Sequence, residues 1–147
     1  GWYDYLKGLD YKKEYYLFGF CIGMQVLFSK SEEGSQSGLD LFKGKVIRIN
    51  SDYKNNSIKV PAMGWKEVKL LRENKLLKNV KDKTLFYFVH SFICLPEDKN
   101  IIIGLSNHSF DYPSIINKDN IFATQFHTEK SHKNGMKLME NFINFDE

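Results

Sequence analysis

The stretch from Tyr15 to Phe28 constrains the fold of this 147-residue chain more than any other segment. It reads YYLFGFCIGMQVLF: an apolar, aromatic run, then a cysteine between two glycines, then a second apolar run. We expect a buried strand over residues 15–20 and a helix from Ile22 towards Lys30. The two glycines, Gly19 and Gly23, remove side chains that would crowd a sharp strand-to-helix turn. The pattern is typical of a nucleophile elbow in which a thiol replaces the hydroxyl.

Cys21 would then lie at the N-terminus of a helix, where the helix dipole favours the reactive thiolate. The backbone N–H of Ile22 would point at the oxyanion that forms when the sulfur attacks a carbonyl group. The alternative is that Cys21 is a small buried hydrophobe, as free cysteines often are. Partners elsewhere in the chain discriminate between these two interpretations.

A second motif near the other end of the chain supplies such partners. A short apolar strand over residues 121–126 leads into His127, and Glu129 follows two residues later. Alternation on an extended segment would put both side chains on the same side. The carboxylate could then orient the imidazole, and the imidazole could take the thiol proton. Together the two motifs predict a Cys–His–Glu triad, although neither histidine nor cysteine is persuasive alone.

Composition restricts the remaining possibilities. We expect one domain over residues 1–147, because 42% hydrophobic and 27% charged residues are ordinary for a globular protein. The net charge of +3 is small and lysine is dispersed, which argues against a nucleic-acid partner. The two cysteines, Cys21 and Cys94, form neither a disulfide framework nor a metal-ligand spacing, which favours a cytoplasmic location and no metal. We interpret Cys94 as a packing residue. No signal peptide or membrane-spanning run of ~18 apolar residues is visible.

Four segments carry a resemblance to a known family: FCIGMQVLF, KVPAMGW, FYFVHSF and TQFHTEKSH, in this order. Over residues 17–142 the chain resembles the class I glutamine amidotransferases. The second and third segments narrow the resemblance to glutaminase subunits of imidazole glycerol phosphate synthase, which serve histidine biosynthesis. The resemblance implies an α/β fold with a mixed central sheet flanked by helices. It also implies hydrolysis of glutamine through a cysteine thioester, no cofactor, and ammonia transfer to a cyclase subunit held as a heterodimer partner.

The resemblance also implies residue roles beyond the triad of Cys21, His127 and Glu129. Contacts to glutamine would come from the Ile22 N–H, Gln25, Glu33 at the amino group of the substrate, and the backbone of Ser91 and Phe92. The cyclase interface would include Trp65, Tyr87 and Lys130. From the residues alone, Trp65 could equally be a core residue. His90 is either a second general base or a structural histidine, and we favour the structural role because one imidazole suffices.

Departures from the family pattern keep alternatives open. Ala62 and Lys66 stand where the family usually has histidine and asparagine, and both fall on the expected partner surface. Thr128 replaces the proline that would stiffen the turn before Glu129. One alternative is therefore a paralogous subunit that supplies ammonia for amidation of a bacterial surface sugar. Others are an inactive or binding-only fragment, and a cysteine peptidase on the same architecture.

The segment before Cys21 is short for this family. Family members begin with a strand, a helix and further strands, and a glycine-rich loop there supplies a second oxyanion donor. We therefore expect an N-terminally truncated fold that lacks its first strand–helix units and half of the oxyanion hole.

Two local expectations concern the second half of the chain. Residues 114–120 read as a turn. Ser131 is expected to cap a last helix that runs to Asn144, with a buried stripe at helical spacing formed by Met136, Met139, Phe142 and Ile143.

Overall fold

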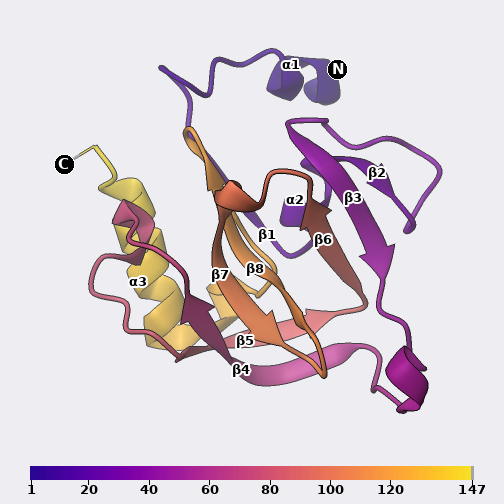
Figure 1. Ribbon diagram of the computed structural model, residues 1–147. Coiled ribbons are helices and arrows are strands. Elements are labelled where there is room, and N and C mark those ends of the chain that lie inside the picture. Colours follow the sequence, from indigo (N-terminus) through magenta and orange to yellow (C-terminus); the bar gives the residue numbers. More distant parts are fainter. Residues whose placement is uncertain (147) are drawn as a thin grey trace.

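The computed structural model describes residues 1–146, and its mixed α/β fold contains two sheets (Figure 1). The larger sheet has six strands in the order β1-β9-β8-β7-β4-β5. They are β1 (Leu17–Phe20), β9 (Ile121–Thr124), β8 (Asp111–Lys118), β7 (Ile102–Asn107), β4 (Ala62–Leu70) and β5 (Thr84–His90). The smaller sheet has three strands in the order β2 (Phe28–Ser31), β3 (Phe42–Arg48) and β6 (Phe92–Pro96). The α-helices are α1 (Trp2–Lys7), α2 (Ile22–Gln25) and α3 (His132–Ile143), and 3₁₀ turns form at η1 (Tyr53–Asn55), η2 (Lys75–Leu77), η3 (Lys99–Ile101) and η4 (Thr128–Lys130). The expected mixed sheet with flanking helices is confirmed.

The pairing of β1 with β9 connects the two ends of the chain. The strands are parallel and in register, from Leu17 opposite Ile121 to Phe20 opposite Thr124. Every residue of β9 is buried, as expected for a parallel strand covered on both faces. Because parallel strands end at the same sheet edge, the residues after Phe20 and after Thr124 emerge side by side.

Two apolar cores cover β9 from its two faces. Phe122 belongs to the core that includes Leu138 of α3, whereas Ala123 belongs to the core that includes Met24 and Phe42. Alternation along the strand produces this division. In Figure 1, α3 accordingly lies on one flank of β7 and β8, and the smaller sheet lies on the other. The end of β9 is thus held by packing on both sides.

The helix expected from Ile22 to Lys30 is wrong beyond its first turn. Helix α2 ends at Gln25, and residues 28–31 form β2, parallel to β3. The carbonyl groups of Val26 and Leu27 accept hydrogen bonds from the backbone N–H groups of Leu39 (2.7 Å) and Leu41 (2.9 Å). These long-range bonds replace the bonds that a continuing helix would make.

The turn expected over residues 114–120 is also wrong. Strand β8 continues to Lys118, with Ser114, Ile115 and Ile116 buried, and the turn is confined to residues 119–120. The backbone N–H of Asn120 is tied to the carbonyl of Tyr11 at 3.0 Å, so the turn packs against the N-terminal segment.

The last helix forms as expected, but its predicted buried stripe is only partly correct. Phe142 packs against the core and Met139 is partly buried. Met136 is 73% exposed and Ile143 74% exposed, whereas Gly135, Leu138 and Asn141 are buried. A shift of one residue rotates a helix by about 100°. No helix within residues 1–146 combines the length and apolar character needed to cross a membrane.

Candidate active site

Cys21 lies in a strained turn between β1 and α2. Its φ of 50° and ψ of −105° are unusual for a residue with a side chain, and such strain is often found at functional sites. The turn is held by the Cys21 N–H, which donates to the Thr124 carbonyl at 2.8 Å. A β-carbon on Gly19 would lie 2.5 Å from the carbonyl oxygen of Gly23, whereas one on Gly23 would meet nothing within 4 Å. The elbow is therefore present, but only Gly19 is required by a close approach.

His127 and Glu129 form the expected pair directly after β9. The Nδ1 of His127 lies 2.6 Å from Oε1 of Glu129, and both side chains are partly exposed. The expectation that an extended segment aligns them is wrong, because Thr128–Lys130 forms the 3₁₀ turn η4. With Nδ1 donating to the carboxylate, Nε2 is the nitrogen left to accept a proton.

The thiol of Cys21 is not hydrogen-bonded to His127 among the described residues. Its Sγ donates instead to the carbonyl oxygen of Val89 at 3.7 Å. The structure thus brings the three residues of the predicted triad to one sheet edge, with the thiol of Cys21 directed at the end of β5. Catalytic hydrogen bonds are often long or unformed until substrate binds.

The electrostatic surroundings favour the neutral thiol. Burial raises the pKa of Cys21, and the carboxylates of Glu129 and Glu33 raise it further, against hydrogen bonds from Ile22 and Gln125 that lower it. The N–H at the start of α2 favours the thiolate, as expected, but burial and the two carboxylates outweigh it. A helix of one turn supplies the Ile22 N–H but little macrodipole. A base must take the thiol proton before attack.

The turn that carries Glu129 is fixed by buried contacts at Thr128. The hydroxyl of Thr128 lies 3.0 Å from that of Thr124, which in turn donates to the Phe126 carbonyl. A β-carbon at Gly135 of α3 would lie 1.8 Å from the Thr128 carbonyl oxygen, so the helix packs directly on the turn. A hydroxyl network therefore ties this turn where the family usually has a proline ring.

Ser131 precedes α3 but does not cap it with its side chain, so the predicted cap is wrong. Its hydroxyl donates to the His127 carbonyl at 2.7 Å and accepts from the Tyr87 N–H at 3.0 Å. The His127 N–H donates to the Tyr87 carbonyl at 2.9 Å. Ser131 therefore locks the residue that carries the imidazole to strand β5.

The residues expected to contact glutamine offer unused polar groups. Gln25 is buried in α2, and its Oε1 has no hydrogen-bond partner within residues 1–146. Glu33 is exposed in the loop after β2, close enough to influence Cys21. The carbonyl of Ser91 already accepts a hydrogen bond from the Ile49 N–H (2.9 Å), and the carbonyl of Phe92 accepts one from Nδ1 of His90 (2.8 Å). The N–H of Ser91, in contrast, has no partner in the described part of the chain.

His90 has both ring nitrogens engaged. Nδ1 lies 2.8 Å from the Phe92 carbonyl and Nε2 lies 3.3 Å from the Tyr112 hydroxyl. Burial lowers the pKa of His90 to about 4, so the imidazole is neutral and donates through Nδ1. The geometry supports the structural role rather than that of a second base.

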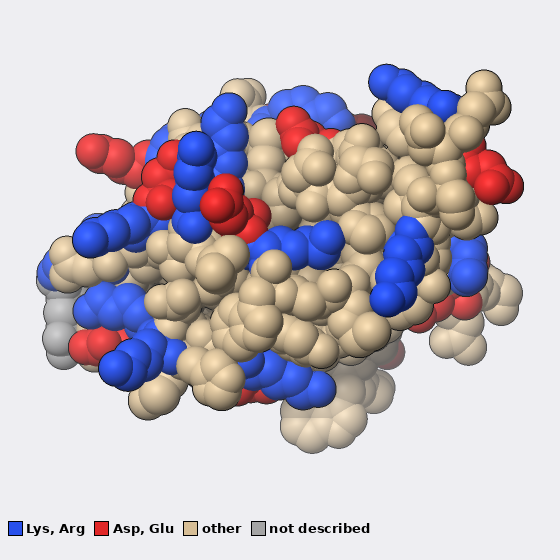
Figure 2. Space-filling view, turned by 90° about the horizontal axis from the view of Figure 1, so that it is seen from below, with Lys and Arg blue, Asp and Glu red and all other residues tan. Residues whose placement is uncertain are grey.

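The three residues expected at a partner interface lie beside the triad. Trp65 is 45% exposed, so it is not a core residue, and its ring packs on Tyr87 (5.8 Å between centroids) and stacks on His132 (5.4 Å, 11°). Lys130 is exposed in η4. Met63 and Leu85 add exposed apolar side chains from β4 and β5. Figure 2 views the molecule from below Figure 1 and shows an uncharged area bordered and partly crossed by Lys and Arg side chains.

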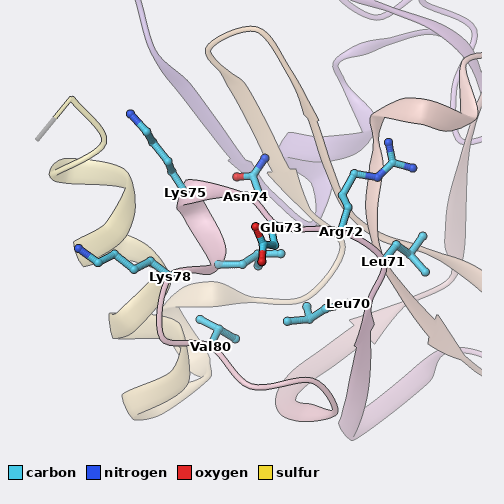
Figure 3. Close-up of a pocket in the computed structure, with 9 residues that line it drawn as sticks. Leu70, Leu71, Arg72, Glu73, Asn74, Lys75, Lys78 and Val80 are labelled. Carbon is cyan, nitrogen blue, oxygen red and sulfur yellow. The ribbon is translucent and has the colours of Figure 1, made fainter.

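A shallow pocket of about 760 Å³ lies elsewhere, between the end of β4 and η2 (Figure 3). Leu70, Leu77 and Val80 contribute apolar lining, and the side chains of Arg72 and Lys75 extend outward from it. None of the predicted site residues lines this pocket. Within residues 1–146 no group of three potential metal ligands occurs.

Sequence reasoning missed two groups that contact Cys21. One is the Val89 carbonyl, and the other is the side chain of Gln125, whose Nε2 lies 4.0 Å from the Cys21 sulfur. A backbone carbonyl leaves no sequence signal. Gln125 did leave one, because it is a lone amide in the apolar run that leads to His127. Cys94 is buried as expected, and its Sγ donates to Gln125 Oε1 at 4.0 Å.

Comparison with known proteins places this geometry in context. Residues 10–145 match the family model described as "Glutamine amidotransferase class-I". The chain is 45% identical over 139 residues to the imidazole glycerol phosphate synthase subunit HisH of Leptospira borgpetersenii, covering 95% of the chain and 68% of that protein. It is 45% identical over 131 residues to HisH of Neisseria meningitidis serogroup B, covering 87% of the chain and 62% of that protein.

Among solved structures, a putative GMP synthase protein from Thermoplasma acidophilum is similar with a TM-score of 0.69. The match covers 97% of this chain and 60% of that one at 18% identity, so it bears on the fold alone. The chain thus spans between 60% and 68% of the length of these three proteins.

Proposed function

Because the chain belongs to the class I glutamine amidotransferase family, we propose that it hydrolyses the side-chain amide of glutamine and supplies ammonia to the cyclase subunit of imidazole glycerol phosphate synthase. One observation carries the chemical part of this proposal. The in-register parallel pair β1–β9 brings the strained Cys21 turn and the His127–Glu129 pair to the same sheet edge. The synthase part rests on the HisH relatives.

The reaction begins with transfer of the thiol proton. His127, oriented by Glu129 through Nδ1, takes the proton of Cys21 at Nε2, and the sulfur attacks the amide carbon of glutamine. The Ile22 N–H stabilises the resulting oxyanion. The carbon–nitrogen bond then breaks, the imidazolium returns the proton to the leaving ammonia, and a glutamyl thioester remains. Water, deprotonated by the imidazole, attacks the thioester and releases glutamate and the thiol.

Recognition of glutamine is assigned to groups that the protein leaves unused. Gln25 presents a buried acceptor without a donor, and glutamine carries N–H donors that could satisfy it. The carboxylate of Glu33 complements the α-ammonium group of the substrate. The free N–H of Ser91, with the backbone of Phe92 beside it, complements the α-carboxylate.

The partner surface is assigned to the face around Trp65, with Tyr87 and Lys130 at its edge towards the triad. The exposed side chains of Met63 and Leu85 continue this face. Aromatic and apolar side chains of this kind are enriched where interfaces form. Two free cysteines agree with a reducing cytoplasm. The HisH relatives give no support to the sugar-amidating or binding-only alternatives.

Labelling with an electrophilic glutamine analogue tests the chemical assignment. Mass spectrometry should find the label on Cys21, and excess glutamine should block it. Cys94 is the internal control, because it is a buried thiol on strand β6 of the smaller sheet. Equal modification of Cys21 and Cys94 in the folded protein would rule out a glutamine pocket at the elbow.

A separate measurement tests the partner. Trp65→Ala should weaken association with the cyclase by tenfold or more, as expected for a central aromatic anchor. Trp2→Ala is the matched control, because Trp2 is also exposed but lies in α1. Equal affinities for the two variants would move the interface away from β4.

A further inference from the structure

The side-chain amide of Gln125 lies between the two thiols of the chain. The residue follows β9, is fully buried, and its backbone N–H donates to the Ser114 carbonyl at 2.9 Å. Its Nε2 lies 4.0 Å from the sulfur of Cys21, and its Oε1 lies 4.0 Å from the sulfur of Cys94. The amide therefore bridges the nucleophile and a second cysteine that the proposed reaction does not use.

The direction of this amide follows from Cys94. Burial raises the pKa of the Cys94 thiol, so the group stays protonated and acts as an S–H donor. An S–H donor needs an oxygen, which places Oε1 at Cys94 and leaves Nε2 facing Cys21. The Cys21 S–H is satisfied separately by the Val89 carbonyl at 3.7 Å. The four groups thus form one consistent chain of donors and acceptors from Cys94 to Val89.

We propose that Gln125 is a positioning residue that directs an N–H at the Cys21 sulfur and stabilises its thiolate, with Cys94 fixing the direction of the amide. Loss of the thiol proton removes the bond to the Val89 carbonyl. It strengthens the bond from Nε2, because an N–H bond to an anion is charge-assisted. The hydrogen bond from Gln125 accordingly lowers the pKa of Cys21, against the effect of burial. The inference rests on the proposed function only in taking the thiolate of Cys21 as the nucleophile.

Alkylation of Cys21 by iodoacetamide as a function of pH tests the role, because the reagent reacts with the thiolate. Gln125→Met keeps the length of the side chain and removes the N–H donor. We expect the apparent pKa of Cys21 to rise by about one unit in this variant, which is a roughly tenfold slower reaction at a fixed pH below the pKa. Site-resolved mass spectrometry separates Cys21 from Cys94, and thermal unfolding confirms that each variant is folded.

The second cysteine supplies a matched pair of variants. Cys94→Ala removes the donor to Oε1 and should slow alkylation of Cys21 about threefold, because the freed amide samples the wrong orientation. Cys94→Ser keeps a donor and should stay near the wild-type rate. A purely structural role for Gln125 predicts altered thermal stability with an unchanged apparent pKa.

An unchanged apparent pKa of Cys21 in folded Gln125→Met would overturn the proposal. If that variant does not fold, the Cys94 pair decides, and equal alkylation rates in Cys94→Ala, Cys94→Ser and wild type would overturn it as well. Iodoacetamide requires no glutamine site. Failure of the glutamine analogue to label Cys21 would therefore sink the glutaminase proposal without altering this result.

Discussion

Substitution of the two elbow glycines by alanine should separate their roles. In Gly19→Ala the new β-carbon would lie 2.5 Å from the Gly23 carbonyl oxygen and 2.7 Å from its carbon, both backbone atoms. Ordinary contacts of a β-carbon begin at 3.4 Å, so the elbow must shift by roughly 0.9 Å, and overpacking of this kind costs about 1–3 kcal/mol. The hydrogen bond from Cys21 to Thr124 resists the shift. We expect a loss near the middle of this range.

Gly23→Ala is the matched control within the same motif. Its β-carbon would meet nothing within 4 Å, and Gly23 lies inside α2. Alanine is favoured over glycine in a helix by about 1 kcal/mol, of which a helix of one turn realises only part. The free energy of unfolding should therefore stay at or slightly above that of the wild type.

Chemical denaturation measures the two free energies, and thermal melting provides a second reading. A loss of about 2 kcal/mol corresponds to a melting temperature lower by roughly 4–8 °C for a domain of this size. Labelling of Cys21 by the glutamine analogue should fall in Gly19→Ala. Equal stability of the two variants, or greater damage from Gly23→Ala, would refute the argument from the close approach.

Three further perturbations follow from the same geometry. Gly135→Ala should destabilise the protein by about 2 kcal/mol or more in thermal melts, because the new β-carbon would lie 1.8 Å from the Thr128 carbonyl oxygen. The control variant Lys133→Ala, on the exposed face of α3, should have little effect on the melting temperature. His90 has a pKa of about 4 in the folded protein and 6.5 in the unfolded chain, so its contribution to stability is complete above pH 6.5 and is lost as the pH falls towards 4. Denaturation curves should show a loss of at most about 3 kcal/mol in the free energy of unfolding over this range. The variant His90→Gln should lack this pH dependence. Glu129→Gln should lower the kcat for glutamine hydrolysis about 100-fold or more with little change in KM, because the imidazolium loses its carboxylate, and an unchanged kcat would remove Glu129 from the triad.

The candidate catalytic positions could be picked out from the sequence because each is part of a short local motif. Cys21 is marked by its flanking glycines, and His127 and Glu129 by their position at the end of an apolar strand. Their meeting depends on the parallel pairing of β1 with β9, a long-range contact that neither motif encodes. The family resemblance implied that the two motifs meet, but the strand pairing that brings them together is visible only in the structure.

The failures of sequence reasoning share a physical cause. The segment after Gln25 left the helix because its carbonyl groups found partners at Leu39 and Leu41, far along the chain. Half of the predicted stripe of α3 was wrong, because Met136 and Ile143 are apolar but face solvent, while Gly135 is buried by close packing on η4. Tertiary contacts of this kind override local propensity and pattern.

The protonation state of Cys21 is the property least accessible from sequence. The elbow motif suggested a thiolate, yet burial and two carboxylates outweigh the Ile22 N–H. Residue identity names the groups that act on the sulfur, but their balance depends on desolvation, which only the packed structure determines.

A resting neutral thiol has a consequence for the order of events. Glu129 and Glu33 each oppose the thiolate of Cys21 in the free protein. In the assignment above, Glu33 holds the α-ammonium group of glutamine, and this positive charge offsets the carboxylate. Bound glutamine therefore removes one of the charges that raise the pKa of Cys21, while Glu129 remains to stabilise the imidazolium that receives the proton. Under the proposed assignment, the substrate thus takes part in forming the nucleophile, and the free site keeps its cysteine in the less reactive form.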